Sequence, residues 1–169
     1  MNEAVKGKYW EDFEVGMRFV TRSRTVTEAD IVNFAGISGD WNPLHVDVEH
    51  AKQGPFGERI AHGMLGLAIA SGLMQSLELY PDTLVAFLGL NWRFRAPIKI
   101  GDTIRVEQVI AEKRETRNPE RGILIIATKV LNQRDEVVQE GDRQIMLRRR
   151  PVPAGRGRTG GEGGGTCRP

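Results

Sequence analysis

The stretch that decides the fold is Ile60–Leu79, which reads IAHGMLGLAIASGLMQSLEL. Across positions 61–74, only His62 and Ser71 are neither apolar nor glycine. A helix on a protein surface carries a polar stripe, so the absence of one before Gln75 predicts a helix that is covered on most sides. The run is also shorter than the ~20 apolar residues that cross a bilayer. We therefore expect a buried helix held by a sheet rather than a membrane span.

The N-terminal end of this helix has the features of a site for a developing negative charge. Free backbone N–H groups and the positive end of the helix dipole are expected near His62–Met64. A glycine at position 63 lets a substrate approach the backbone without a Cβ in the way. Just upstream lies GDWNPLHVD, Gly39–Asp47. A carboxylate, an imidazole and a helix N-terminus are thus close together in sequence.

Composition excludes several classes of protein. The chain has 169 residues, of which 40% are hydrophobic and 27% charged, values ordinary for one globular domain with a core. A net charge of +2 does not favour nucleic-acid or membrane binding. No apolar segment follows Met1, so we expect no signal peptide. The single cysteine, Cys167, excludes an intrachain disulfide and a cysteine metal cluster. A cytoplasmic protein is the default expectation.

The residues before the long helix indicate short elements. Thr27 is a typical N-cap, with acidic residues in the following turn. Asn42-Pro43 disfavours helix, which predicts a loop at Trp41–Val46. The pattern therefore predicts a strand at Met17–Val26, a helix at Glu28–Ile37, a short helix at Val48–Lys52 capped by Asp47, and an irregular loop at Gln53–Arg59.

The residues after the long helix alternate as strands do. Four strands are expected, at Leu84–Arg95, Thr103–Arg114, Gly122–Asn132 and Glu136–Leu147. Short connections between successive strands imply antiparallel neighbours. We expect an α+β fold, with one curved antiparallel sheet wrapped around the central helix. From Arg150 the chain is glycine-rich and basic, so we expect a single domain at 1–149 and a disordered tail at 150–169.

All three histidines, His45, His50 and His62, fall within one short window. One interpretation is a metal site that Asp47 joins, although the spacing matches no closed zinc pattern. The other is acid–base chemistry by His45 beside Asp40, since a histidine titrates near neutrality and a carboxylate can orient its ring or share a water. Spacing alone favours a third interpretation over acid–base chemistry, in which Asp40 only caps a turn and His45 packs in the core.

The run SGDWNPLHVD at 38–47, followed by Phe56-Gly57 and then IAHGML, resembles the MaoC-like dehydratases, which include the (R)-specific enoyl-CoA hydratases. The D-x-N-P-x-H run and the I-A-H-G-M-L run are specific at this separation. The resemblance extends over about Tyr9–Arg148 and includes NWRFRAPIKIGDTI at 91–104. It implies the hot-dog fold, in which a long helix lies in an antiparallel sheet and two chains usually pair edge to edge.

The resemblance also implies a reaction and its residues. The family's catalytic aspartate falls on Asp40, its histidine on His45, and its oxyanion-binding N–H on Gly63. The pair would activate a water that adds to a trans-2-enoyl thioester and gives the (R)-3-hydroxyacyl product, or the reverse. The supporting serine of the family falls on Ser71, for which we expect a hydrogen bond to the catalytic loop. Asn42 is expected to hold that loop, and no cofactor or metal is implied.

The partners that the resemblance implies are an acyl-CoA or acyl carrier protein thioester and a second copy of the chain, as a homodimer or a dimer of dimers. His62 is expected to be structural and His50 exposed. Arg93, Arg95 and Lys99 are candidates for the coenzyme A phosphates, although charges in a strand usually form a solvated face. Two alternatives remain open. One is a hot-dog thioesterase, which would need a carboxylate near the helix, and 62–74 contains none. The other is a non-catalytic acyl-thioester-binding protein.

Overall fold

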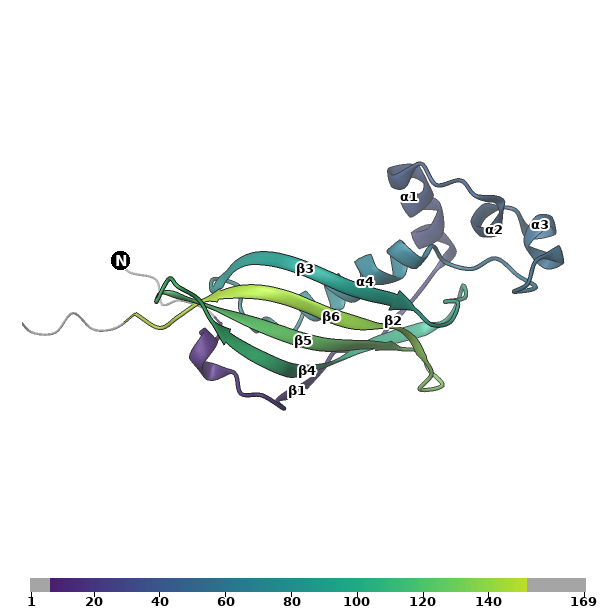
Figure 1. The fold of residues 1–169 in the computed structure, drawn as a ribbon. Coiled ribbons are helices and arrows are strands. Elements are labelled where there is room, and N and C mark those ends of the chain that lie inside the picture. Colours follow the sequence, from purple (N-terminus) through teal and green to yellow (C-terminus); the bar gives the residue numbers. More distant parts are fainter. Residues whose placement is uncertain (1–6, 152–169) are drawn as a thin grey trace, which may run out of the picture.

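The central helix lies against a curved antiparallel sheet, as expected. In a computed structural model, which describes residues 7–151, α4 (Gly63–Gln75) runs along one face of the sheet (Figure 1). A short helical turn, η1 (Trp10–Asp12), covers one end of the sheet, and three helices stand at the other end (Figure 1). Those helices are α1 (Glu28–Ser38), α2 (Pro43–Val46) and α3 (Val48–Gln53). The α+β, hot-dog arrangement is confirmed.

The four long strands begin and end close to their predicted positions. They are β3 (Leu84–Phe94), β4 (Thr103–Glu115), β5 (Arg121–Leu131) and β6 (Val137–Arg148). The expected first strand is broken into β1 (Arg18–Val20) and β2 (Arg24–Thr25). The break falls at Thr21, whose hydroxyl accepts a hydrogen bond from the Val106 N–H. Both short strands pair with β4.

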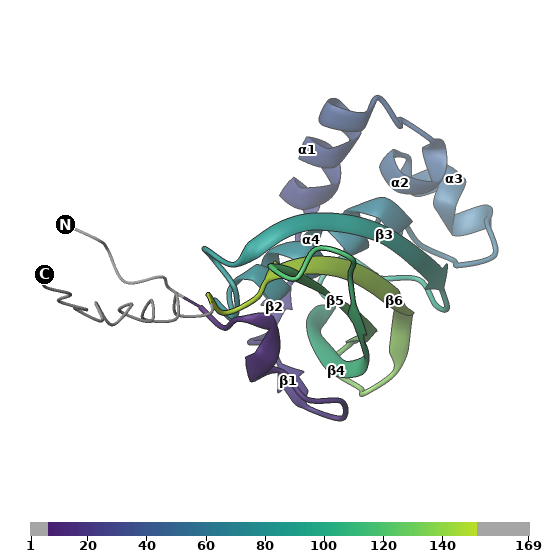
Figure 2. The ribbon, with the colours of Figure 1, turned by 60° about the vertical axis from the view of Figure 1, so that its left-hand side comes forward.

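The strand order differs from the simple meander that the short connections predicted. The order is β1-β4-β5-β6-β3, so β3 pairs with β6 and not with β4. The connection between β3 and β4 therefore crosses the end of the sheet, which Figure 2 shows. Ile60 and Ala61 hold this crossing, because Ile60 bridges Lys99 and the Ala61 N–H donates to the Ile98 carbonyl. As a result, β3 forms one edge of the sheet.

The central helix is shorter and less covered than predicted. Ile60 and Ala61 are extended because they pair with the crossing segment, so the helix begins at Gly63 and ends at Gln75. One stripe of α4 is exposed to solvent in the single chain. It consists of Met64, Ala68, Ser71, Gly72 and Gln75. The prediction of a helix covered on most sides was wrong for this stripe. No helix among the described residues is long and apolar enough to span a membrane.

The predicted loop at Trp41–Val46 was also wrong in part. Asn42 caps α2 by accepting a hydrogen bond from the Leu44 N–H, and Pro43 occupies the first helical position. Proline is favoured there because its missing N–H has no helical partner in any case. The other two caps are as predicted, with Thr27 on α1 and Asp47 on α3. The tail expected to be disordered lies, from residue 152 on, outside the described residues.

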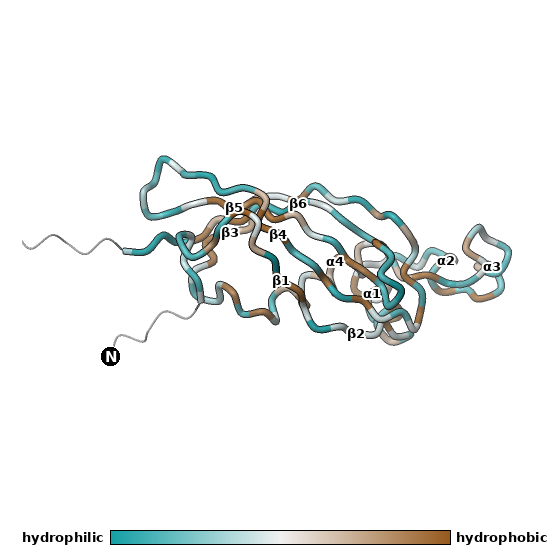
Figure 3. The backbone as a smooth tube through the Cα atoms, turned by 90° about the horizontal axis from the view of Figure 1, so that it is seen from below, coloured by the Kyte–Doolittle hydropathy of each residue, from teal (hydrophilic) through white to brown (hydrophobic). Residues whose placement is uncertain are grey.

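Two apolar clusters form the core. The first packs α4 against β4, β5 and β6 and includes Leu65, Ile69, Val106 and Val130. The second lies at the end of the sheet covered by η1 and is built around Phe13, Ile110 and Leu124. Figure 3 shows hydrophobic colours where β3, β4 and β5 meet at that end. The first cluster therefore anchors the helix whose N-terminus borders the site described next.

Candidate active site

The loop between α1 and α2 carries Asp40 in a chain of local hydrogen bonds. Gly39 ends α1 in a left-handed conformation with φ of 74°, which a glycine adopts without strain. The Ser38 hydroxyl accepts from the Asp40 N–H at 3.2 Å, and the Asp40 carboxylate accepts from the Asn42 N–H at 3.2 Å. Asn42 in turn caps α2. Asn42 therefore fixes the loop that presents Asp40, and Asp40 itself is exposed.

The tautomer of His45 follows from its partner. The ring is buried, and its Nδ1 lies 2.8 Å from the Ile60 carbonyl oxygen. A carbonyl oxygen only accepts, so Nδ1 carries the proton and donates it. The other nitrogen, Nε2, then holds a free lone pair in a neutral ring. The bond to Ile60 thus fixes both the tautomer and the orientation of the ring.

His62 connects the aspartate and the histidine. Its ring stacks on that of His45, with centroids 3.8 Å apart, and its Nε2 donates to the Asp40 carbonyl oxygen at 2.9 Å. Side-chain ligand atoms of Asp40, His45 and His62 all lie within 4.8 Å of one another. His62 is only 2% exposed, and its Nδ1 is buried without a partner. The sequence indicated a structural role for His62 but not this contact.

The residues that the structure groups as possible metal ligands differ from those that the sequence suggested. Asp47 caps α3 and accepts from the Glu49 and His50 N–H groups, and His50 is exposed. These backbone bonds, led by the one from His50, lower the pKa of Asp47. Neither residue lies in the group around His45. That group does place an Asp and two His side chains within reach of one ion, but each histidine already gives one nitrogen to a backbone carbonyl.

A pocket of about 450 Å³ opens beside His45 and the start of α4. His45 and Gln139 are polar groups in its wall, and most of the remaining wall is apolar. The apolar part comes from Phe56, Ile60, Ala61, Met64, Phe94, Ala96, Pro97 and Ile98. This volume and lining suit a small, largely apolar group such as a short acyl chain.

The first turn of α4 faces this pocket. His62 stands at the N-cap position, but its side chain makes no hydrogen bond to the first turn. The leading N–H groups of a helix have no partner within it. Gly63 lines the pocket, and a Cβ at this position would lie 2.9 Å from the Phe94 ring. Gly63 therefore lies in the pocket wall at the start of α4, close against Phe94.

Gln139 fixes that turn from the sheet. Its Nε2 donates to the Gly63 carbonyl at 3.0 Å, and its Oε1 accepts from the Trp92 indole at 3.0 Å. Gly66 permits this approach, since a Cβ there would lie 2.2 Å from the Gln139 Nε2. Gln139 was missed from sequence, because a glutamine inside a strand pattern gives no signal of a contact 76 residues away.

Most of the other predicted residues lie apart from the pocket. Ser71 lies eight residues along α4 from Gly63, about 12 Å at 1.5 Å per residue, on the exposed stripe. Within residues 7–151, Ser71 makes no hydrogen bond to the Asp40 loop. Among the three cations considered for phosphate binding, Arg95 lines the pocket and pairs with Glu140, while Lys99 pairs with Glu58. Arg93 lies on the other face of the sheet.

Comparisons with known proteins identify the family of this chain. The model of the MaoC like domain matches residues 12–130. This chain belongs to the MaoC-like family. A 3-hydroxybutyryl-CoA dehydratase of Methylorubrum extorquens is 34% identical to this MaoC-like chain, over 82% of the chain and 83% of the relative. An (R)-specific enoyl-CoA hydratase of Rhodospirillum rubrum is 31% identical, over 82% of the chain and 91% of the relative.

Solved structures share the fold. The monoamine oxidase regulatory protein of Archaeoglobus superposes with a TM-score of 0.81 at 38% identity, over 86% of this chain and 97% of that one. An unliganded R-hydratase of Pseudomonas aeruginosa gives 0.72 at 34% identity, over 86% and 89%. A Mycobacterium tuberculosis protein described as a double hotdog gives 0.71 at 22% identity and is covered over 45% of its length. This MaoC-like chain thus corresponds in fold to about half of a double hotdog.

Proposed function

We propose that this MaoC-like protein is a hydro-lyase that hydrates trans-2-enoyl-CoA thioesters to (R)-3-hydroxyacyl-CoA. In the reverse direction it dehydrates the (R)-3-hydroxyacyl-CoA. The observation that carries the proposal is that His45 and Gly63, at the first turn of α4, line one apolar pocket, while the Asp40 carboxylate lies within 4.8 Å of the His45 ring. The curated relatives include proteins named for each direction of this reaction.

The chemistry follows from the tautomer of His45. Asp40 and His45 hold a water between them, and the free Nε2 of His45 takes one of its protons as the oxygen bonds to the β-carbon. The pair then returns one proton to the α-carbon, so that the elements of one water are added in total. A positioned acid–base group of this kind typically contributes 10²–10⁴ in rate.

The amide of Gly63 stabilises the negative charge that develops on the substrate as the water adds. As the water oxygen bonds to the β-carbon, electron density moves to the thioester oxygen and forms an enolate. The amide of Gly63, at the positive end of α4, donates to this oxygen. Loss of one such donor typically costs roughly 10²–10³ in kcat. The apolar wall excludes bulk water and strengthens this interaction.

The proposal is tested by hydration of crotonyl-CoA. We expect Asp40→Asn and His45→Gln each to lower kcat by roughly 10²–10⁴ with an unchanged circular-dichroism spectrum. His50→Gln, in the same segment but exposed, is the matched control and should keep full activity. Chiral chromatography of the hydrolysed product should give the (R) isomer. Full activity in both site variants, or an (S) product, would overturn the proposal.

We further propose that the protein is a homodimer joined through β3. This strand is the edge of the sheet, and its side chains are exposed along most of its length. Phe87, Leu88, Leu90 and Phe94 are each at least 40% exposed. An open apolar edge next to the exposed stripe of α4 suits a second copy of the chain, which pairs antiparallel with it.

Sedimentation at micromolar concentration should show a dimer, and Phe87→Glu with Leu90→Glu should give monomers. A wild-type monomer would contradict this proposal.

A further inference from the structure

The first turn of α4 has little stability of its own. It reads Gly63-Met64-Leu65-Gly66, so two of its four residues are glycines. Each glycine weakens a helix by roughly 0.5–1 kcal/mol relative to alanine. The N-cap residue, His62, gives the turn no side-chain hydrogen bond. Because unsupported helix ends fray, the order of this turn depends on contacts from elsewhere in the fold.

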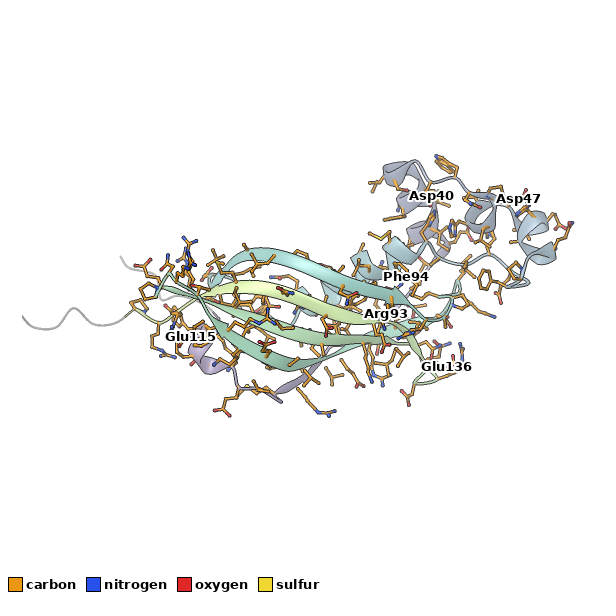
Figure 4. All side chains as sticks on the ribbon, viewed as in Figure 1. Asp40, Asp47, Arg93, Phe94, Glu115 and Glu136 are labelled. Carbon is orange, nitrogen blue, oxygen red and sulfur yellow. The ribbon has the colours of Figure 1, made fainter. Side chains whose placement is uncertain are left out.

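Phe94 and Gln139 supply two such contacts from the sheet. They are directly opposite each other in the register of β3 and β6. The Phe94 ring lies against Gly63, where a Cβ would be 2.9 Å from it, and the Gln139 amide donates to the Gly63 carbonyl at 3.0 Å. Figure 4 shows Phe94 at the same end of the sheet as Asp40. One pair of neighbouring residues thus holds Gly63 at two points beside the catalytic loop.

The backbone around Gln139 is a rigid base for this contact. Its strand, β6, has a strand neighbour on each side, β5 and β3. The carbonyl of Val138 accepts from the N–H groups of both Arg95 and Ala96, at 2.9 and 3.1 Å. Gln139 itself is only 2% exposed. Its side chain therefore extends toward the helix from a fixed position.

Trp92 determines which way the Gln139 amide faces. An indole N–H can only donate, and that of Trp92 lies 3.0 Å from Oε1 of Gln139. If the amide were turned over, its N–H groups would face the indole N–H, and its oxygen would face the Gly63 carbonyl. Both contacts would be repulsive, so Nε2 stays directed at Gly63. We call this chain of two hydrogen bonds, from Trp92 through Gln139 to Gly63, the Trp92–Gln139 relay.

The N–H of Gly63 is held on both of its flanks. On one flank, the His62 ring donates to the Asp40 carbonyl and stacks on His45. On the other flank, the Gly63 carbonyl accepts from Gln139. A glycine is restricted little by its own backbone, so these two anchors set the direction in which the N–H points.

We propose that Gln139 and Trp92 are positioning residues, which direct the Gly63 N–H at the thioester oxygen of the substrate. This inference rests on the proposed hydration of an enoyl thioester. Both residues act through Gly63 and not on the reacting atoms. A hydrogen bond to the thioester oxygen strengthens as negative charge develops there. Loss of the relay therefore lowers kcat more than it weakens substrate binding.

The first test compares kcat and KM for crotonyl-CoA. Gln139→Met keeps the length of the side chain but has no amide. We expect kcat to fall about tenfold or more and KM to stay within about twofold, because the lost alignment matters most in the transition state. Gln144→Met is the control, since Gln144 is an exposed glutamine of the same strand. Equal kcat in these two variants would overturn the inference.

The second test distinguishes a relay from two independent contacts. Trp92→Phe removes the indole N–H and keeps an aromatic ring. Alone it should lower kcat, because the Gln139 amide is then free to turn over. Combined with Gln139→Met it should cause no further loss, since the indole acts only through the amide that it orients. Losses that multiply in the double variant would refute the role of Trp92.

The third test displaces the amide from the side of the helix. A Cβ at Gly66 would lie 2.2 Å from the Gln139 Nε2 and 2.7 Å from the Ile98 side chain. We expect Gly66→Ala to lower kcat about tenfold, although alanine itself favours a helix. Gly72→Ala is the control on the same helix, because a Cβ there meets nothing within 4 Å. Equal kcat in both glycine variants would contradict the relay.

The fourth test observes the bond to the substrate directly. Asp40→Asn is used because slow turnover leaves crotonyl-CoA intact while its infrared spectrum is recorded. On binding, the thioester carbonyl band should move to lower wavenumber, since a donated hydrogen bond weakens the C=O bond. Adding Gln139→Met should remove at least about half of this shift, and adding Gln144→Met should preserve it.

The infrared and kinetic results separate the two proposals. An equal band shift with Gln139→Met and with Gln144→Met would overturn the inference, whatever the rate of hydration. A wild-type protein that shifts the band but does not hydrate crotonyl-CoA would refute the proposed function alone.

Discussion

At Gly63 the missing side chain allows close packing and, in the proposed mechanism, access to the amide. The Phe94 ring lies over it, and its amide heads the helix beside the pocket. We predict that Gly63→Ala lowers kcat/KM for crotonyl-CoA by about 10²-fold, because the methyl group displaces either the Phe94 ring or the substrate oxygen. Gly36→Ala is the control, since a Cβ at that position of α1 meets nothing within 4 Å. It should raise the free energy of unfolding by roughly 0.5–1 kcal/mol and leave activity unchanged. Equal activity in both variants would contradict the role of the Gly63 amide.

We propose that His62 acts on the site through Asp40, as a positioning residue. His62→Phe keeps a ring against His45 but leaves the Asp40 carbonyl without its donor. We expect kcat to fall about tenfold or more with KM unchanged, since small displacements of a catalytic group are costly. His62→Gln retains an N–H near the same place and should restore most of the loss. A purely structural role would instead lower the melting temperature of both variants and leave the surviving kcat intact.

At the level of single residues, only part of the site could be predicted from the sequence. Asp40, His45 and Gly63 were found through a specific motif. The structure places His45 and Gly63 in one pocket wall and the Asp40 carboxylate within 4.8 Å of the His45 ring. Their chemical roles stay predictions. The stack of His62 on His45 and the Gln139 bond to Gly63 were not predicted, because both depend on contacts between distant segments. Ser71 was expected near the loop, but the turn of the helix places it on the exposed stripe.

Among the elements, the loop before α4 is tied to α1 by one ion pair. Arg59 donates two hydrogen bonds to the Glu28 carboxylate, at 2.7 and 2.6 Å. These bonds hold the pKa of Glu28 below its ordinary value. The pair therefore stabilises the folded state above the pKa of Glu28 in the unfolded chain, ~4.3, and this contribution is lost as the pH falls through the lowered pKa of the folded state.

We predict that hydrogen exchange in residues 54–59, corrected for its intrinsic pH dependence, accelerates once the pH falls below ~4. Glu28→Gln should show the faster exchange at neutral pH already. Glu49→Gln is the control, because Glu49 pairs with Lys52 inside α3 and does not connect the loop to another element. An exchange rate in wild type that is independent of pH after correction would contradict the prediction.

Element boundaries were predictable where periodicity and caps are local signals. The four long strands, α1 and α3 all begin within one or two residues of the predicted position. The pairing of β3 with β6 was not predictable from connection length, because it depends on a crossing held by Ile60 and Ala61. The same contact shortened α4. Alternating side chains thus identify strands but not their neighbours.

In the molecule as a whole, Trp10 closes the end of the sheet opposite the site. Its indole donates to the Ile123 carbonyl and packs on Gly122, where a Cβ would lie 2.5 Å from the ring. We predict that Trp10→Ala lowers the free energy of unfolding by roughly 3–5 kcal/mol in urea denaturation. Trp41→Ala removes an exposed indole and should change it by less than about 0.5 kcal/mol. A loss below about 1 kcal/mol for Trp10→Ala would show that η1 is dispensable.

The position of β3 also has a consequence for synthesis on the ribosome. Among the strands of residues 7–151, β3 pairs with β6 alone, and β6 is the last of them to be made. While β4 and β5 are being translated, β3 has no neighbour, and its aromatic and aliphatic side chains stay uncovered. Unpaired edges of this kind promote aggregation of nascent chains. Gln139 of β6 also completes the pocket wall beside Phe94. A chain released before residue 137 is translated would therefore lack a finished pocket.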